Sequence, residues 1–202
     1  MWTLALETAS QHGSLALFEG DRCVGCEGLE GRAYAATLIP AIERLLRAQG
    51  LRPAALGLLA VADGPGSFTG VRIGLATVKA LMETNHTPAV AVGTLEAVAG
   101  ASEDEHTLAV MDAGRNMVYV RRDGVEEEEA AEAFASKLEQ WRGKAVTPDA
   151  ALTARWPVLE AIEPRLAPAV GRLALARWRR QPGAADDVLR LDARYLGARW
   201  GT

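Results

Sequence analysis

Residues 64–74 read Gly-Pro-Gly-Ser-Phe-Thr-Gly-Val-Arg-Ile-Gly and separate two segments of different character. Before them, Leu56–Ala62 is an apolar run of the length expected of a strand buried on both faces. After them, Thr69 to about Thr84 carries a helical pattern. The stretch therefore predicts a glycine loop that joins a buried strand to a helix, a connection typical of α/β proteins.

This loop allows two interpretations. Gly64 and Gly66 let the backbone turn sharply, and Ser67 or Thr69 can cap the helix. Free N–H groups at such a helix start attract anions, phosphate above all. The structural alternative is that the glycines only permit a tight turn and close helix packing. Both interpretations stay open, and the candidate anion or nucleotide contacts are Gly64, Gly66, Ser67 and Thr69.

Three better-known loop motifs are excluded by the letters themselves. A Walker P-loop needs Gly-Lys-Ser/Thr, whereas Val71 follows Gly70. A nucleophile elbow needs Gly-x-Ser-x-Gly, but Ser67 follows Gly66 directly. A dinucleotide fingerprint needs a third glycine where Thr69 stands.

The first hundred residues predict three strands followed by alternating helices and strands. The first three strands are joined by tight turns and should be antiparallel, whereas the later ones need helical crossovers and should be parallel. The result is a mixed sheet covered by helices. The predicted strands are Trp2–Thr8, Ser14–Phe18, Asp21–Leu29, Leu56–Ala62 and Ala89–Val92, and the predicted helices are Tyr34–Gln49, Thr69–Thr84 and Thr94–Gly100.

The second half repeats this order in a reduced form. We therefore predict a duplicated fold with subdomains 1–102 and 103–202, the second of them smaller. Its predicted strands are Thr107–Met111, Met117–Arg122, Val125–Glu128 and Lys144–Thr147, with an extended return over Val188–Tyr195. Its predicted helices are Ala131–Trp141, Ala150–Arg155, a short piece at Leu159–Ile162, and Pro168–Arg180.

The composition of the 202 residues is that of an ordinary globular protein, with 49% hydrophobic residues and a net charge of −4. The longest apolar run, Ala54–Ala62, is too short to span a membrane, and Met1–Thr8 lacks the features of a signal peptide. We therefore expect a cytoplasmic protein with no membrane contact. Residues 165–202 hold eight arginines against three aspartates, which indicates either a solvated helix face or a contact with nucleic acid or an acidic partner.

The two cysteines, Cys23 and Cys26, form a C-x-x-C motif, a spacing found in zinc and redox sites. A structural zinc site needs four ligands, and no second ligand pair accompanies the motif. In a regular strand, residues three apart point to opposite faces, so these thiols should diverge. We expect two reduced strand residues without a shared role.

The run of residues 64–74, the opening Leu-Ala-Leu-Glu-Thr-Ala at 4–9 and Met-Asp-Ala-Gly-Arg at 111–115 together resemble the TsaB (formerly YeaZ) family. The resemblance implies an α/β fold of the actin/Hsp70/sugar-kinase (ribonuclease H-like) type. It also implies an accessory role in making tRNA threonylcarbamoyladenosine, beside the catalytic paralogue TsaD and the ATPase TsaE. That complex moves a threonylcarbamoyl group from its adenylate to adenosine 37 of tRNAs that read codons beginning with A.

The family resemblance further implies a homodimer in isolation and tRNA contact only through the complex. The residues themselves offer no set of metal or cofactor ligands, so we expect no cofactor and no metal. The two helices of the first subdomain are implied as the contact surface. Our candidates for it are Leu38, Ile42, Leu45, Gly70, Gly74, Ala76, Thr77 and Ala80. Some of these residues must instead pack their helices onto the sheet, and the sequence does not divide the two sets.

The chemistry expected of an enzyme of this fold is not evident in the sequence. Glu7 is present at the first loop, but the loop's glycine comes late, at Gly13. The stretch Gly31–Pro40 has no histidine, and Tyr34 stands about where relatives often keep one. No nucleophile or metal set supports the older glycoprotease-like label, so we expect a platform rather than a catalyst. The alternatives are a stand-alone ATP-binding or kinase-like enzyme and, more weakly, a direct tRNA binder.

Overall fold

The computed structural model describes residues 1–29, 34–102, 104, 106–181 and 191–196. The chain forms two compact units, each built on one five-stranded sheet. The first unit comprises Met1–Thr94 and Arg165–Arg194, and the second comprises Leu95–Pro164 together with the described residues from Tyr195 on. No helix among the described residues is both long and apolar enough to cross a bilayer.

The sheet of the first unit has the strand order β3-β2-β1-β4-β5. As predicted, β1, β2 and β3 pair antiparallel, while β4 and β5 join in parallel. Because β4 is central and covered on both faces, its apolar sequence is buried almost throughout. The strands are β1 (Trp2–Glu7), β2 (Ser14–Glu19), β3 (Arg22–Gly28), β4 (Leu56–Ala62) and β5 (Ala89–Val92).

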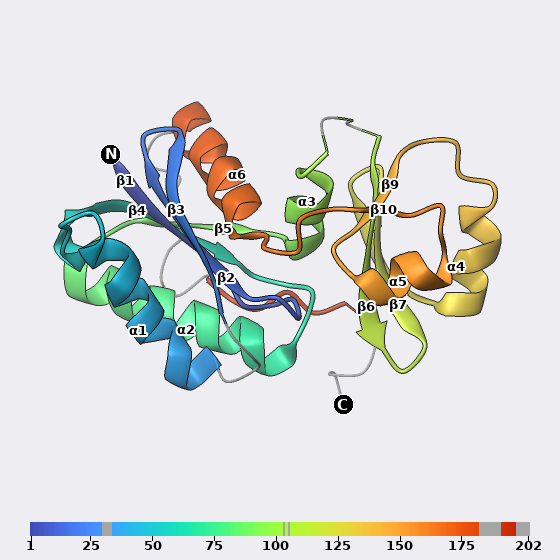
Figure 1. Cartoon of the computed structure of the whole chain (residues 1–202), viewed down its shortest axis with the longest axis horizontal. Coiled ribbons are helices and arrows are strands. Elements are labelled where there is room, and N and C mark those ends of the chain that lie inside the picture. The colour runs from blue at the N-terminus through green and yellow to red at the C-terminus, as the bar shows by residue number, and fades with distance from the viewer. Residues whose placement is uncertain (30–33, 103, 105, 182–190, 197–202) are drawn as a thin grey trace. The chain divides into compact units, whose positions relative to one another are not determined.

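Helices cover both faces of this sheet. Helices α1 (Tyr34–Arg47) and α2 (Phe68–Asn85) lie on one face, and α6 (Ala167–Arg180) lies on the other (Figure 1). A 3₁₀ turn, η1 (Pro53–Ala55), precedes β4. Gly171 lets α6 approach closely, because a Cβ there would overlap the ring of the fully buried Phe18 on β2.

The second unit has the strand order β10-β9-β6-β7-β8. Its core gathers apolar residues of the sheet around Phe134, which meets Trp156 edge to face at a centroid distance of 5.0 Å. The strands are β6 (Leu108–Gly114), β7 (Met117–Arg122), β8 (Val125–Ala130), β9 (Ala145–Thr147) and β10 (Glu160–Ala161). The helices are α3 (Thr94–Ala99), which begins at the last residue of the first unit, α4 (Ala131–Leu138) and α5 (Ala150–Arg155).

The two sheets repeat one topology, with three antiparallel strands followed by two parallel ones, which confirms the predicted duplication. The helical piece predicted at Leu159–Ile162 is wrong, because Glu160 and Ala161 pair in parallel with β9 as its neighbour β10. The predicted return at Val188–Tyr195 lies partly outside the described residues.

The last helix changes the division of the chain. Although α6 follows the second sheet in sequence, it packs on β1, β2, β4 and β5 of the first. The structure therefore groups Arg165–Arg194 with the first unit, where the sequence predicts a simple split into 1–102 and 103–202. The reason is the apolar face of α6, whose buried residues meet a sheet face that α1 and α2 leave uncovered.

The expectation that the two cysteines diverge is wrong. Strand β3 carries a β-bulge, since Phe18 pairs with Cys23 while Leu17 pairs with Gly25. Val24 is the extra residue, and Cys26 then pairs with Ala16. The additional residue shifts the alternation by one, which places Cys23 and Cys26 on the same face of β3.

Candidate functional site

The candidate site lies at the carboxyl edge of the first sheet, where ligands of open α/β sheets commonly bind. Strand β1 ends there at Glu7 and β4 ends at Ala62, so their following loops meet. Backbone contacts join the loops directly, because the N–H of Ser67 donates to the carbonyl of Ala9 over 2.7 Å. The site is thus built from loop Thr8–Gly13, loop Asp63–Ser67 and the segments that touch them.

Glu7 is fully buried, and its carboxylate binds the loop that follows it. Oε1 accepts the N–H groups of Ala9 and Ser10 at 2.6 and 2.7 Å. Oε2 accepts the hydroxyl of Ser10 at 2.7 Å. The carboxylate of Glu7 is thus directed at its own backbone, and it occupies the amide groups of Ala9 and Ser10.

Tyr34 closes the same loop from the first turn of α1. Its hydroxyl accepts the N–H of Gly13 at 3.0 Å and donates to the carbonyl of Ser10 at 3.1 Å. The ring lies so near Gly13 that a Cβ at that position would stand 2.7 Å from it. The residue found where relatives often keep a histidine therefore fastens the loop, which gives a physical reason to expect a weak phosphate grip there.

The glycine loop packs against the chain itself. A Cβ on Gly66 would overlap the Ala9 carbonyl, and one on Gly64 would overlap the carbonyl of Arg194. Gly64 also has a φ of +112°, which side chains rarely adopt. Both glycines thus serve a close approach of backbone segments.

Ser67 caps α2, since its hydroxyl accepts the N–H of Gly70 at 3.2 Å. Thr69, the second residue of the helix, is exposed. Anion contact by Gly64, Gly66, Ser67 and Thr69 therefore stays a prediction, and it rests chiefly on the exposed start of α2.

Asp63 is a site residue that the sequence analysis did not single out. It is 7% exposed, and its Oδ2 accepts the guanidinium of Arg194 at 3.2 Å. Burial raises the pKa of Asp63, an effect that the nearby Arg194 and Arg177 offset only in part. Oδ1 is buried and has no hydrogen-bond partner among the described residues, as is also true of the hydroxyl of Thr94, the first residue of α3.

Three of the predicted contact residues on α1 face the interior of their own unit. Leu38, Ile42 and Leu45 are 1%, 3% and 8% exposed. Leu45 illustrates the fit, because its Cδ1 lies 2.8 Å from where a Cβ on Gly25 would stand. The prediction that these three side chains form a partner surface is corrected here: burying each contributes about 1.5–3 kcal/mol to folding instead.

The predicted residues of α2 divide into two sets. Gly70 and Gly74 are buried, and a Cβ on either would overlap Thr8, the residue that follows β1. They too serve packing within the unit, which corrects their assignment to the interface. Ala76 and Ala80 are exposed and Thr77 is half-buried, so these three remain available on the outside of α2.

Ile39 is an outward-facing residue that the sequence analysis did not separate from its neighbours. It is 48% exposed, one of few large apolar side chains so exposed among the described residues. The sequence carried no clear signal for this, since Ile39 stands three residues before the buried Ile42 and seven before the buried Leu46, spacings that share one side of a helix. We define the outer face of α1 and α2 as Ile39, Ala76, Thr77 and Ala80.

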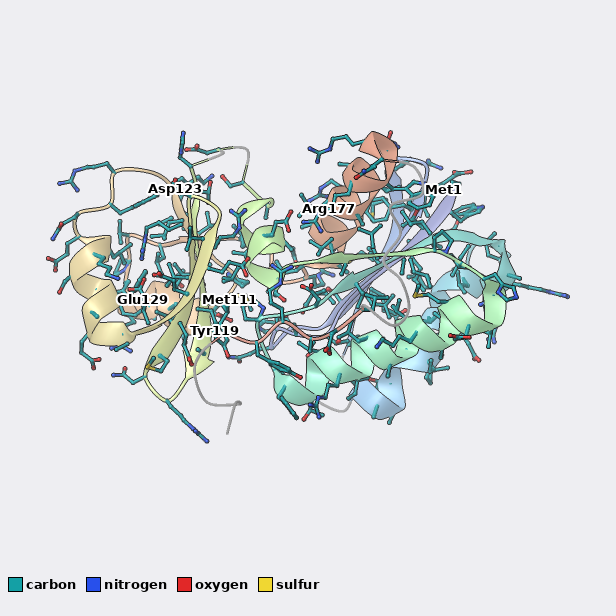
Figure 2. The ribbon with its side chains drawn as sticks, turned by 180° about the vertical axis from the view of Figure 1, so that it is seen from behind. Met1, Met111, Tyr119, Asp123, Glu129 and Arg177 are labelled. Carbon is teal, nitrogen blue, oxygen red and sulfur yellow. The ribbon has the colours of Figure 1, made fainter. Side chains whose placement is uncertain are left out.

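The charged residues around Glu129 in the second unit form a network of ion pairs. Glu129 on β8, which is labelled in Figure 2, binds Arg122 at 2.7 Å and Lys137 of α4 at 2.8 Å. Burial acts to raise the pKa of Glu129, but the hydrogen bonds from Lys137 and Arg122 outweigh it and hold the pKa below its ordinary value. Among the described residues of both units, no group of three or more His, Cys, Asp or Glu side chains could hold a metal ion.

The duplicated sheets and the loops at the first sheet's carboxyl edge define the class: an α/β protein of the ribonuclease H-like, actin-like type. Residues 29–156 match the family described as "TsaD: tRNA N6-adenosine threonylcarbamoyltransferase". A TsaB protein of Escherichia coli is 31% identical over 174 residues, which cover 79% of this chain and 75% of the relative. The chain belongs to the TsaB family.

Other similar proteins belong to the same family. The solved structure "YeaZ from Pseudomonas aeruginosa" has a TM-score of 0.78 at 26% identity and covers 96% of this chain and 99% of its own. The TsaB protein of Haemophilus influenzae is 32% identical over 57% of this chain and 51% of the relative. The matched part thus spans about half the length of that protein, as it does for the Bacillus subtilis relative, at 53%.

Proposed function

We propose that this chain is a non-catalytic platform in the biosynthesis of tRNA threonylcarbamoyladenosine. It would bind and support a TsaD-type catalytic paralogue, together with a TsaE-type ATPase, in the complex that transfers threonylcarbamoyl from its adenylate to adenosine 37 of tRNAs reading ANN codons. The names of its relatives support the pathway, since the proteins of H. influenzae, B. subtilis and E. coli are all called tRNA threonylcarbamoyladenosine biosynthesis protein TsaB. We propose that this biosynthesis takes place in the cytoplasm.

The observation that carries the non-catalytic role is the bonding of Glu7. A carboxylate that accepts three hydrogen bonds from its own loop has little capacity left for a metal-bound nucleotide. The Tyr34 hydroxyl occupies the N–H of Gly13 in the same loop. A ligand phosphate would have to displace these bonds, so we propose no cofactor and no metal for this chain.

The partner surface we propose is the outer face of α1 and α2. Its alanines are small, and small residues let a second helix approach closely, while Ile39 supplies an apolar anchor. Two such helix pairs would form a four-helix bundle about a two-fold axis. A second copy and the catalytic paralogue would use the same face, so the homodimer and the heterodimer should compete, and tRNA would be reached only through the complex.

The experiment is a mixing titration of the purified chain with its TsaD-family paralogue, followed by light scattering after size exclusion. We expect a homodimer alone and a one-to-one complex that replaces it as the paralogue is added. A chain that stays homodimeric or monomeric in the presence of excess paralogue would contradict the platform.

A stand-alone ATP-binding or kinase-like enzyme is the second candidate. Oδ1 of Asp63 favours it, since this atom has no hydrogen-bond partner within the part of the chain that the structure describes and is buried at the edge where open α/β sheets bind ligands. Calorimetry with magnesium ATP on the isolated chain separates the two functions. Micromolar binding accompanied by hydrolysis supports the enzyme, and the absence of both supports the platform.

A further inference from the structure

Cys23 and Cys26 share one face of an edge strand, and the proposed function does not use them. Strand β3 ends the sheet of the first unit, and among the described strands it pairs with β2 alone (Figure 1). Both cysteines are exposed and reduced. The Cys23 thiol lies 3.5 Å from the carbonyl oxygen of Gly25, within the loop of the bulge.

Contacts of the neighbouring residues show to which side of the sheet the Cys23 side chain points. Gly25 lies against Leu45 of α1, and Glu27 forms an ion pair with Arg44 of the same helix, so both point to the α1 face. On the partner strand, Phe18 lies against Gly171 of α6. Cys23 is paired with Phe18 and therefore points to the α6 face.

Cys26 follows by the same reasoning. It is paired with Ala16, which shares its face with Phe18 because the two are separated by one residue in a regular part of β2. The next residue on that side is Gly28, where a Cβ would lie 3.6 Å from Cδ of Arg165, just before α6. Both thiols thus stand in a row on one side of an accessible edge.

The spacing of such a row decides what can bridge it. Phe18 and Ala16, the pairing partners of the two cysteines, are same-face neighbours on β2 about 6.6 Å apart, twice the rise per residue, and the cysteines opposite them take a similar spacing. A disulfide needs Cβ atoms about 3.8 Å apart and sulfurs about 2.05 Å apart, so it would require the backbone to move. A metal ion with two bonds of about 2.3 Å accommodates sulfurs up to about 4.6 Å apart, which side-chain rotation can supply.

We propose that Cys23 and Cys26 form a two-thiolate site for a thiophilic metal ion of low coordination number, with Cu(I) as the ion its chemistry favours. Soft thiolates select soft ions, and two ligands do not satisfy the tetrahedral demand of Zn²⁺. No third His, Cys, Asp or Glu joins the pair within the described residues. Binding forms two metal–sulfur bonds and releases one proton from each thiol, with no change of oxidation state.

The test is an anaerobic titration of the reduced chain with Cu(I) in competition with a chromogenic Cu(I) chelator. We expect one ion per chain. Cys23→Ser and Cys26→Ser should each weaken binding at least about 100-fold, because one thiolate alone cannot chelate. Equal affinity in wild type and either single variant would overturn the proposal.

Two further variants test the face rather than the thiols. Cys26→Ser combined with Glu27→Cys keeps two cysteines but turns the second toward α1, so tight binding should be lost, and its survival would overturn the proposal. Deletion of Val24 removes the bulge yet leaves both thiols on one face, so binding should persist within about tenfold of wild type. Circular dichroism checks that each variant is folded, and the relocated cysteine keeps the test decisive if the deletion unfolds the chain.

Oxidation of the wild type supplies an independent readout. With a mild disulfide-forming oxidant, the native chain should keep two titratable thiols and its full mass. Rapid loss of both thiols with a decrease of two hydrogens in mass, while the fold persists, would show that the sulfurs meet directly and would contradict the spacing on which the metal site depends.

Discussion

Arg194 binds Asp63 twice across 131 residues of sequence. Its main-chain N–H donates to the Asp63 carbonyl at 2.7 Å, and its guanidinium donates to Oδ2 at 3.2 Å. The carbonyl of Arg194 in turn lies over Gly64, at the start of the glycine loop. The segment that ends the first unit is thereby fixed to the edge of its sheet, at the side chain whose pKa burial raises.

The first prediction concerns Asp63 and pH. Because its pKa is raised in the folded chain, the folded state holds its proton more tightly than the unfolded state does. The free energy of unfolding of the wild type should fall as pH rises from about 4 through the raised pKa. Asp63→Asn cannot titrate at this position, so its stability lacks this pH dependence. The free energy of unfolding of Asp63→Asn relative to wild type, from urea titrations, should therefore increase with pH.

Glu129→Gln is the control for this prediction, because its stability relative to wild type should change with pH in the opposite direction. The pKa of Glu129 is lowered by folding, so its stabilisation is present above its ordinary pKa and is lost as pH falls through the lowered value. The stability of Glu129→Gln relative to wild type should therefore decrease as pH rises. If both variants showed the same slope, the environment assigned to Asp63 would be wrong.

The second prediction separates a structural Glu7 from a catalytic one. Glu7→Ala leaves the N–H groups of Ala9 and Ser10 without their acceptor in a buried loop, which should destabilise the chain by about 3 kcal/mol. Glu7→Gln retains one acceptor oxygen and should lose about 1 kcal/mol. Urea unfolding measures both. A Glu7→Ala chain of unchanged stability would show that the carboxylate serves a ligand instead.

The third prediction tests the close approach of α2 and β1. A Cβ on Gly74 overlaps the Thr8 hydroxyl, so Gly74→Ala should destabilise the isolated chain by about 2 kcal/mol. Thr8→Ala removes that hydroxyl and its bond to the Gly70 carbonyl, at a loss of about 1 kcal/mol. The double variant should be clearly more stable than the sum of the two changes implies. Strict additivity in thermal unfolding would exclude the overlap.

The fourth prediction addresses the outer face of α1 and α2. Ala76→Arg and Ile39→Glu place charge on exposed positions, so the fold should be unaffected. Association with a second copy or with the TsaD-family paralogue should weaken at least tenfold, about 1.4 kcal/mol. Val125→Glu is the control, since Val125 is 60% exposed on β8 of the second unit. Sedimentation that changed as much for the control would contradict the assigned surface.

The sequence predicts most of the fold because its periodicities are local. The apolar run at Leu56–Ala62, the turns between the first strands and the repeated element order all depend on residues near one another. The packing of α6 on the first sheet does not, because Gly171 meets Phe18 only in the folded chain. Strand β10 is missed for the same reason, since its two residues form a strand only through pairing with β9.

The site was less predictable than the fold. An apolar pattern shows that Leu38, Ile42 and Leu45 share a face of α1, but it does not show whether that face meets a partner or the chain's own sheet. The exposure of Ile39 shows which side of α1 faces outward, but this exposure is known only from the structure. The bulge at Val24 could not be predicted either, because it is defined by the pairing of β3 with β2 and the sequence of Cys23–Cys26 resembles that of a regular strand.

The most direct measurement is threonylcarbamoyl transfer to adenosine 37, followed by mass analysis of digested tRNA, with threonylcarbamoyl adenylate as donor. We expect no product from this chain alone, and product from the TsaD-family paralogue that increases severalfold when wild-type chain is added but not when Ala76→Arg is added. Product formed by this chain in the absence of the paralogue would contradict the account.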